Sequence, residues 1–322
     1  MQVPVAVLAA LILLLRIDSA GAQSYPVRPL RLVVGNAPGG PTDTVARIVA
    51  QKLSESVGVS VIVDNRSGAT GVVAANLVAK APPDGYTLLL CSSSVMVTTP
   101  LQNPKLPYDT QRDFEPITVV VSLPYLLLVN PASGISSVKE LIALGKAKPG
   151  ELNAGAAGHG STSYLGAAMM ALMAGIEITH VTYKGSALAA IDLMAGRLHF
   201  AFEAIAGGIQ HVKNGKLRPL GVSARNRLSA LPDLPTISEA GVPGYELTTW
   251  HGICTTGGAP PAIVAMLNRE IVAGIKTPQT RERLTEIGAE VVGNSPEEFR
   301  MHLRTERVRW DRVFRQLGLK KS

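Results

Sequence analysis

Short apolar runs alternate with amphipathic segments along most of the chain. The run at 30–34 is followed by a glycine turn and then by a segment with helical periodicity. The apolar face of that segment consists of Val45, Ile48, Val49 and Leu53. Further apolar runs at 59–65 and 86–91 also lead into loops and helical patterns. This alternation predicts an α/β fold built on a parallel, doubly wound sheet.

A second set of strand and helix patterns begins near Pro124–Pro131. A helix pattern at 138–146, a strand pattern at 151–157 and another helix pattern follow it. The apolar stripe of the last helix consists of Leu165, Ala168, Met169, Leu172 and Met173, which we expect to face inward. Two such sets in one chain predict two lobes with a cleft between them.

Helix starts and a C-terminal helix can be assigned from local signals. Capping boxes occur at Thr236 to Glu239 and at Ser295 to Glu298, and Pro260 with Pro261 favours a further helix start. The C-terminal segment predicts a terminal helix with an inward face, formed by Trp310, Val313, Phe314 and Leu317.

The first 22 residues predict a signal peptide. The unbroken apolar run Val5–Leu15 precedes Ala20, Gly21 and Ala22, a small-residue cleavage pattern. A membrane anchor is the alternative, but a bilayer span needs roughly 20 apolar residues. We expect cleavage after Ala22 and export of the mature chain.

Charge and cysteine content narrow the possible partners. The formal net charge is +7, but the basic residues are scattered, so we expect no nucleic-acid partner. Cys91 and Cys254 are predicted to be two buried thiols, although a disulfide is allowed in an oxidising compartment. Without a metal-ligand spacing or a cofactor motif, we expect neither a metal nor a cofactor.

Two glycine-rich loops precede predicted helices. In the first, VVGNAPGGPTD at 33–43, the backbone N–H groups near Thr42 and Asp43 would face outward from a positive helix end and could bind an anion. The alternative is a tight turn at Gly39 and Gly40 with Thr42 as the N-cap. The second loop, GAAGHGSTSYLG at 155–166, has the same design, with hydroxyls at its helix start.

Both loops together favour a carboxylate site. If the lobes face each other, the hydroxyls of Thr42, Ser161 and Thr162 converge, and Ser92–Ser94 adds donors at the rim. Asp43 and Glu203 are acids near this site, and for Asp43 the helix start is the simpler explanation.

A catalytic interpretation is the main competing hypothesis. His159 and Ser161 could form a nucleophilic pair, but the sequence indicates no acid to orient the histidine. The other histidines, at 180, 199, 211 and 251, are dispersed and are expected to be structural. We therefore expect a protein that is not an enzyme, with an exported hydrolase as the alternative.

An ordered set of motifs from Tyr25 onward resembles one family. The motifs are YPVRPLRLVV, PGGPTDTVAR, VDNRSGATG, APPDGYTLLL, YDTQRDFEPI, GHGSTSYLG, HVTYKG, DLMAGRLHF, GKLRPLGVSARNR, LPDLPTISEAGVPGYE and WHGICTTGGAPP. In this order they are similar to the extracytoplasmic solute-binding receptors of tripartite tricarboxylate transporters, the Bug family. The chain departs from the usual family pattern at Pro41, Tyr164 and Ala167 and in the segment CTTGGAPP.

The resemblance implies a periplasmic binding protein-like fold, with two α/β lobes joined by two crossover strands. The crossings are expected near Val119–Leu126 and Thr249–Thr255. The lobes would then comprise 23–121 with 255–322, and 122–254, with the C-terminal helices returning to the first lobe.

The resemblance also implies a small organic acid as ligand, an inner-membrane permease as partner and, as a further alternative, a ligand-dependent sensor protein. The ligand could be a dicarboxylate, tricarboxylate, aromatic acid, amino acid or amide. The candidate ligand-binding residues are Asn36, Pro38, Gly39, Gly40, Thr42, Asp43, Ser93, His159, Gly160, Ser161, Thr162 and Glu203.

Overall fold

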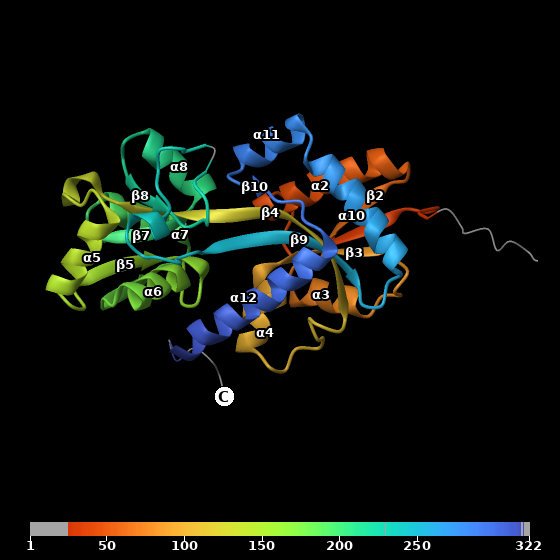
Figure 1. Cartoon of the computed structure of the whole chain (residues 1–322), viewed down its shortest axis with the longest axis horizontal. Helices are drawn as coiled ribbons and strands as arrows, with labels where there is room; N and C mark the ends of the chain where they lie inside the picture. Colours follow the sequence, from red (N-terminus) through yellow and green to blue (C-terminus); the bar gives the residue numbers. More distant parts are fainter. Residues whose placement is uncertain (1–24, 229, 317, 319–322) are drawn as a thin grey trace, which may run out of the picture.

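A computed structural model describes residues 25–228, 230–316 and 318. It contains two α/β lobes, which lie on the left and right of Figure 1 with β4 and β9 passing between them. The signal peptide expected at 1–22 lies outside the described residues, as does Leu317 of the predicted C-terminal stripe.

The N-terminal lobe contains both the first strand–helix units and the C-terminal helices. Its elements are β1 (Leu30–Val34), α2 (Pro41–Val57), β2 (Val61–Asn65), α3 (Val72–Ala79), β3 (Thr87–Ser92), α4 (Thr99–Gln102), α10 (Pro261–Ile275), α11 (Pro278–Glu286), β10 (Glu290–Val291) and α12 (Pro296–Gln316). Helix α10 packs beside α2, and Leu267 and Ile271 join the same core as Val45 and Leu53. Helix α10 thus shares one hydrophobic core with the first strand–helix units.

The second lobe contains the middle of the chain. Its elements are α5 (Val138–Ala147), β5 (Leu152–Ala156), α6 (Thr162–Ala174), β6 (Ile178–Thr182), α7 (Ser186–Met194), β7 (Phe200–Ala204), α8 (Ile205–Lys213), β8 (Arg218–Val222) and α9 (Ile237–Ala240). Both predicted capping boxes form, because Thr236 and Glu239 exchange hydrogen bonds, as do Ser295 and Glu298.

The two crossover strands are β4 (Phe114–Val129) and β9 (Thr248–Thr256). In the described residues the sheet order is β2-β1-β3-β9-β4-β7-β5-β6, and β8 and β10 also pair with β4. Strand β4 pairs with β9 up to Pro124 and with β7 from Tyr125. The expectation of parallel strands is correct for β1 with its neighbours and for β5 with its neighbours. It is wrong for β4 and β9, which run antiparallel to the strands they join.

The predicted inward stripe of α6 is only partly buried. Leu165, Ala168 and Met169 are buried, whereas Leu172 and Met173 are 41% and 43% exposed. These two residues line a groove beside the C-terminal half of α12 instead of entering the core of the lobe. Helical periodicity identified the stripe, but the end of the helix extends past the surface that covers it.

Candidate functional site

A cleft of about 840 Å³ lies where the two lobes meet the crossover strands. Its lining residues come from the start of α2, the end of β3, both crossover strands, the loop before α6 and the start of α8. No Asp, Glu, Lys or Arg lines this cleft in the part of the chain that the structure describes. Any anion bound here would therefore be held by neutral donors.

The first glycine loop leads into the N-terminus of helix α2 at the edge of the cleft. Gly39 has φ +87°, a conformation that a side chain would strain, and Gly40 is the N-cap without a side-chain cap bond. The alternative interpretation of Thr42 as N-cap is therefore wrong. Because α2 begins at Pro41, the Thr42 hydroxyl is left to face the cleft, where its Oγ1 lies 3.4 Å from His251 Nε2.

The side chain of Asp43 stabilises the conformation of this loop through hydrogen bonds. Its carboxylate accepts hydrogen bonds from Gly39 N at 3.0 Å, Arg47 Nε at 2.8 Å and Asn65 Nδ2 at 2.9 Å. Burial alone would raise the pKa of this carboxyl, but the three hydrogen bonds outweigh it and hold the pKa below its ordinary value. Asp43 is 2% exposed and does not line the cleft.

The second glycine loop places the start of α6 on the opposite lobe. Ser161 is the N-cap, and its Oγ accepts from Tyr164 N at 3.3 Å while donating to the Gly158 carbonyl at 2.8 Å. The first-turn amides of Thr162 and Ser163 lack partners in the helix itself, as at any helix start. Both predicted helix N-termini thus open into one cleft.

The proposed catalytic pair is not assembled. Ser161 Oγ is bonded to Gly158 and lies 3.0 Å from Ser163 Oγ, and no hydrogen bond joins it to His159 in the described structure. The His159 ring instead packs against Tyr164, with ring centroids 4.7 Å apart. A histidine held in this way is not oriented to take a proton from Ser161.

Glu203 lies beside the cleft but faces away from it. Its neighbours in β7, Phe202 and Ala204, line the cleft, and alternation along the strand turns Glu203 to the other face, against Gly207 and Gly208 of α8. Burial raises the pKa of its carboxyl, partly opposed by a hydrogen bond from Ser186.

The cleft brings together seven of the twelve sequence-predicted residues. These are Asn36, Thr42, Ser93, His159, Gly160, Ser161 and Thr162. The remaining five, Pro38, Gly39, Gly40, Asp43 and Glu203, do not line it. The glycines and Asp43 determine the conformation of the first loop and so position this part of the cleft wall.

Sequence reasoning missed the polar residues that the crossover strands contribute. Tyr125 of β4 and Thr249 and His251 of β9 line the cleft. The side chains of Thr162 and Thr249 hydrogen-bond Tyr125, although burial still raises the pKa of its hydroxyl. Nothing in the local sequence placed these residues near the glycine loops, because strand pairing over long separations brings them there.

His251 is the most buried titratable group in the cleft wall. It is 9% exposed, and burial lowers the pKa of its imidazole to about 4, so the ring is neutral at physiological pH. Its Nε2 faces Thr42, and its buried Nδ1 has no hydrogen-bond partner among the described residues. A neutral imidazole can both accept and donate a hydrogen bond, which suits a polar ligand.

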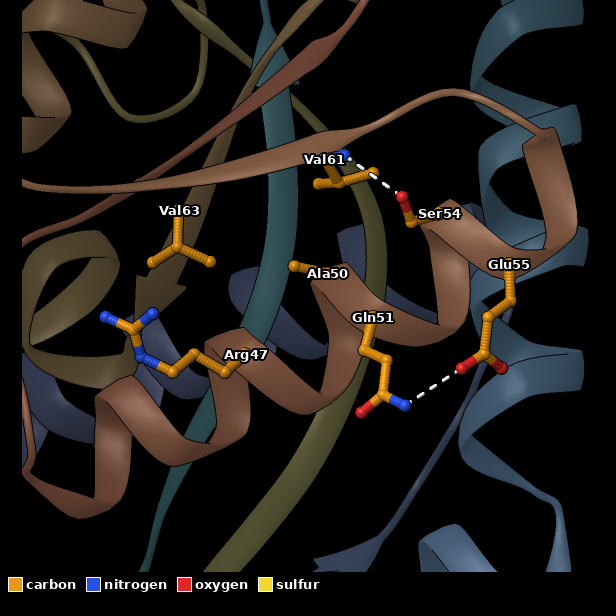
Figure 2. Close-up of a pocket in the computed structure, with 7 residues that line it drawn as sticks. All are labelled: Arg47, Ala50, Gln51, Ser54, Glu55, Val61 and Val63. Carbon is orange, nitrogen blue, oxygen red and sulfur yellow. Dashed lines mark hydrogen bonds between the residues drawn. The ribbon is translucent and has the colours of Figure 1, made fainter.

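A second hollow, of about 570 Å³, lies between α2 and β2 (Figure 2). Two of its polar side chains already form hydrogen bonds with neighbouring residues: Gln51 donates to Glu55, and Ser54 accepts from Val61 N. It contains none of the sequence-predicted residues. Across the described residues, no cluster of His, Cys, Asp or Glu could hold a metal ion, and no helix has the length and apolarity needed to cross a membrane.

Comparison with known proteins gives the same picture of the fold. Residues 45–319 match the model of the tripartite tricarboxylate transporter family receptor. An R. palustris protein solved with adipate is 39% identical, with a TM-score of 0.75, over 91% of this chain and 98% of that one.

Two further solved structures are similar over nearly their whole length. The periplasmic binding protein BugD is 33% identical, with a TM-score of 0.72, over 92% of this chain and 100% of that one. MatC from Rhodopseudomonas palustris, solved with bound malate, is 31% identical, with a TM-score of 0.70, over 90% of this chain and 99% of that one.

Proposed function

Because the chain belongs to the tripartite tricarboxylate transporter receptor family, we propose that it binds a small carboxylate in the periplasm and delivers it unchanged to a membrane permease. One observation carries the proposal: two helix N-termini from opposite lobes open into a cleft that no charged side chain lines among the described residues. Backbone amides and hydroxyls in such a place bind an anion without an opposing charge. The adipate and malate of the related structures belong to this ligand class.

The ligand would contact donors from both lobes. On the N-terminal side these are Asn36, Thr42 and Ser93, and on the other side His159, Gly160, Ser161 and Thr162. We add Tyr125, Thr249 and His251 of the crossover strands to this set. The proposed lobes are 23–121 with 255–322, and 122–254, and the change of β4 partner at Tyr125 supports a boundary near this point.

Export and the absence of catalysis belong to the same proposal. The related periplasmic binding protein supports a periplasmic location. The apolar run at 5–15 and the small residues Ala20, Gly21 and Ala22 support cleavage of a signal peptide after Ala22. The Ser161 hydroxyl donates to the Gly158 carbonyl, and the His159 ring packs against Tyr164. These contacts support binding without turnover. A sensor protein as a second partner stays a prediction, to be tested by ligand-dependent binding of the receptor to the sensor's periplasmic domain.

Thermal unfolding of the mature protein with a panel of small carboxylates tests the proposal. A ligand at 100 times its Kd should stabilise the fold by about 2.7 kcal/mol, and Thr42→Val with Ser161→Ala should weaken that effect. Recovery of the ligand chemically unchanged from the complex would oppose the hydrolase alternative. If no carboxylate shifts the transition, and none copurifies, the proposal fails.

Matched controls separate lost binding from lost stability. Ser161→Ala removes a helix cap, which alone costs about 1 kcal/mol, so it is compared with Ser137→Ala at the N-cap of α5. Thr42→Val is compared with Thr44→Val, because the Thr44 hydroxyl donates to Gly40 O and does not line the cleft. Only the cleft variants should reduce the ligand-induced shift.

A further inference from the structure

Two buried cysteines lie in contact between β3 and the crossover strand β9. Cys91 in β3 and Cys254 in β9 are both 0% exposed, and their Sγ atoms are 2.7 Å apart. This is closer than sulfur atoms of two separate thiols pack. The fold therefore brings together two residues that the sequence places in different halves of the chain.

The pairing of β3 with β9 explains this approach. The strands are antiparallel, and Cys91 lies opposite Gly252 while Cys254 lies opposite Leu89. The cysteines are thus diagonal neighbours on the same face of the sheet. The two side chains therefore extend toward each other across the β3–β9 pair.

We propose that Cys91 and Cys254 form a disulfide bond in the mature protein. One Sγ–Sγ bond forms and two S–H bonds break, two protons are released, and two electrons pass to a thiol–disulfide oxidant of the periplasm by exchange through a mixed disulfide. The oxidising compartment comes from the proposed function, because disulfides form and persist there. The bond replaces the pair of free thiols expected from the sequence.

The bond forms before the sheet closes. Burial, together with the adjacent Cys91, raises the pKa of the Cys254 thiol well above its ordinary value. The thiolate is the species that attacks a disulfide, so the closed sheet would hold the cysteines in an unreactive state. The oxidant must therefore act on the exported chain while it folds.

This disulfide would fix part of the cleft wall. Ser92 follows Cys91 directly, pairs with His251 of β9, and both residues line the cleft. A covalent bond beside this pair holds the end of β3 against the crossover strand. Because the bond also closes a loop of more than half the chain, it restricts the unfolded state strongly.

Thiol labelling tests the proposal directly. Protein exported to the periplasm and purified without reductant is unfolded in guanidinium chloride with a maleimide. We expect no labelling and an intact mass lower than that of the dithiol by two hydrogen atoms, with both cysteines labelled after reduction. Labelling of both cysteines without prior reduction would overturn the proposal.

Thermal stability provides a second test. Cys91→Ala, Cys254→Ala and the double variant each lose the bond, so each should lower Tm by a similar amount, roughly 5–10 °C. Two reduced thiols in contact would also give non-additive losses, so the effect of a reductant on the wild-type protein decides between a bond and a contact. Should a variant not fold, wild-type protein refolded in reductant must show the same fall, and an equal Tm with and without reductant contradicts the bond. Neither test uses a ligand, so failure of the carboxylate screen leaves this proposal intact.

Discussion

Asp43 and His251 have different roles at the cleft: Asp43 stabilises a loop of its wall, and His251 faces the space for a ligand. Asp43 is an acid that the sequence placed at the carboxylate site, but three hydrogen bonds occupy its oxygens behind the glycine loop. The sequence predicts that His251 is one of several dispersed structural histidines, yet it faces Thr42 in the cleft wall. Residue type suggested the chemistry of each, and only the fold determined its direction.

Replacing Asp43 by Asn tests its structural role. The change removes the negative charge of the carboxylate, which accepts hydrogen bonds from Gly39 N and Arg47 Nε. The unfolding free energy should therefore fall by about 1–3 kcal/mol. Urea denaturation measures this loss. Glu55→Gln is the control, because it removes an exposed ion pair with Lys52 and should leave stability nearly unchanged. Similar losses in both variants would show that Asp43 does not anchor the loop.

Stability should depend on pH through His251. Its imidazole has a pKa of about 4 in the fold, against 6.5 as its ordinary value, so between these values the unfolded state binds more protons. The unfolding free energy should therefore fall as pH decreases from 6.5 to 4, by roughly 3 kcal/mol from this residue. His180 and His302, whose pKa values are also lowered by burial, add to the same trend.

The variant His251→Gln isolates this contribution. Glutamine keeps a polar group toward Thr42 but does not titrate, so the pH dependence in this window should be smaller than in the wild type. Denaturant unfolding at several pH values measures the difference. Identical pH profiles would mean that His251 can be protonated in the fold.

At the scale of elements, the sequence predicted what depends on local chemistry. The strand at 30–34, the capping box at Thr236 and the start of α10 at Pro261 all form as expected. The antiparallel direction of β4 and β9 could not be predicted from the alternation of strands and helices. It depends on pairings between distant segments, for which the apolar pattern carries no signal.

The packing of α12 on the crossover strands depends on Gly252. A Cβ at this position would lie 2.7 Å from Phe299 Cζ and 2.9 Å from the Thr118 carbonyl oxygen. Gly252→Ala should therefore force α12 away from β9 and lower the unfolding free energy by about 1–3 kcal/mol, as measured by urea denaturation.

A second substitution tests this cause. Adding Phe299→Leu to Gly252→Ala removes the ring from the clash, so the loss in the double variant should be smaller than the sum of the two single losses. The Thr118 backbone contact remains, and recovery should be partial. Additive losses would show that the ring does not cause the effect.

At the scale of the whole molecule, β4 and β9 pass between the two lobes, and a ligand that binds both lobes can favour a closed form. The chain has two tryptophans, and both lie in this region. Trp250 is in β9 next to His251, and Trp310 of α12 lines the cleft. Their fluorescence should therefore change on ligand binding.

A ligand favours the closed form only if it makes contacts with the second lobe there that it does not make in the open form. With a carboxylate identified by the thermal screen, saturation should change the tryptophan emission and reduce the radius of gyration measured by X-ray scattering. Thr162→Val with Ser163→Ala removes two hydroxyls of α6 and leaves the donors of α2 in place. The ligand should still bind this variant, but more weakly and with less compaction at saturation, because it can no longer favour the closed form as strongly. Equal compaction in variant and wild type would mean that contacts at the α6 hydroxyls do not drive closure, and that the main-chain amides of the second loop suffice.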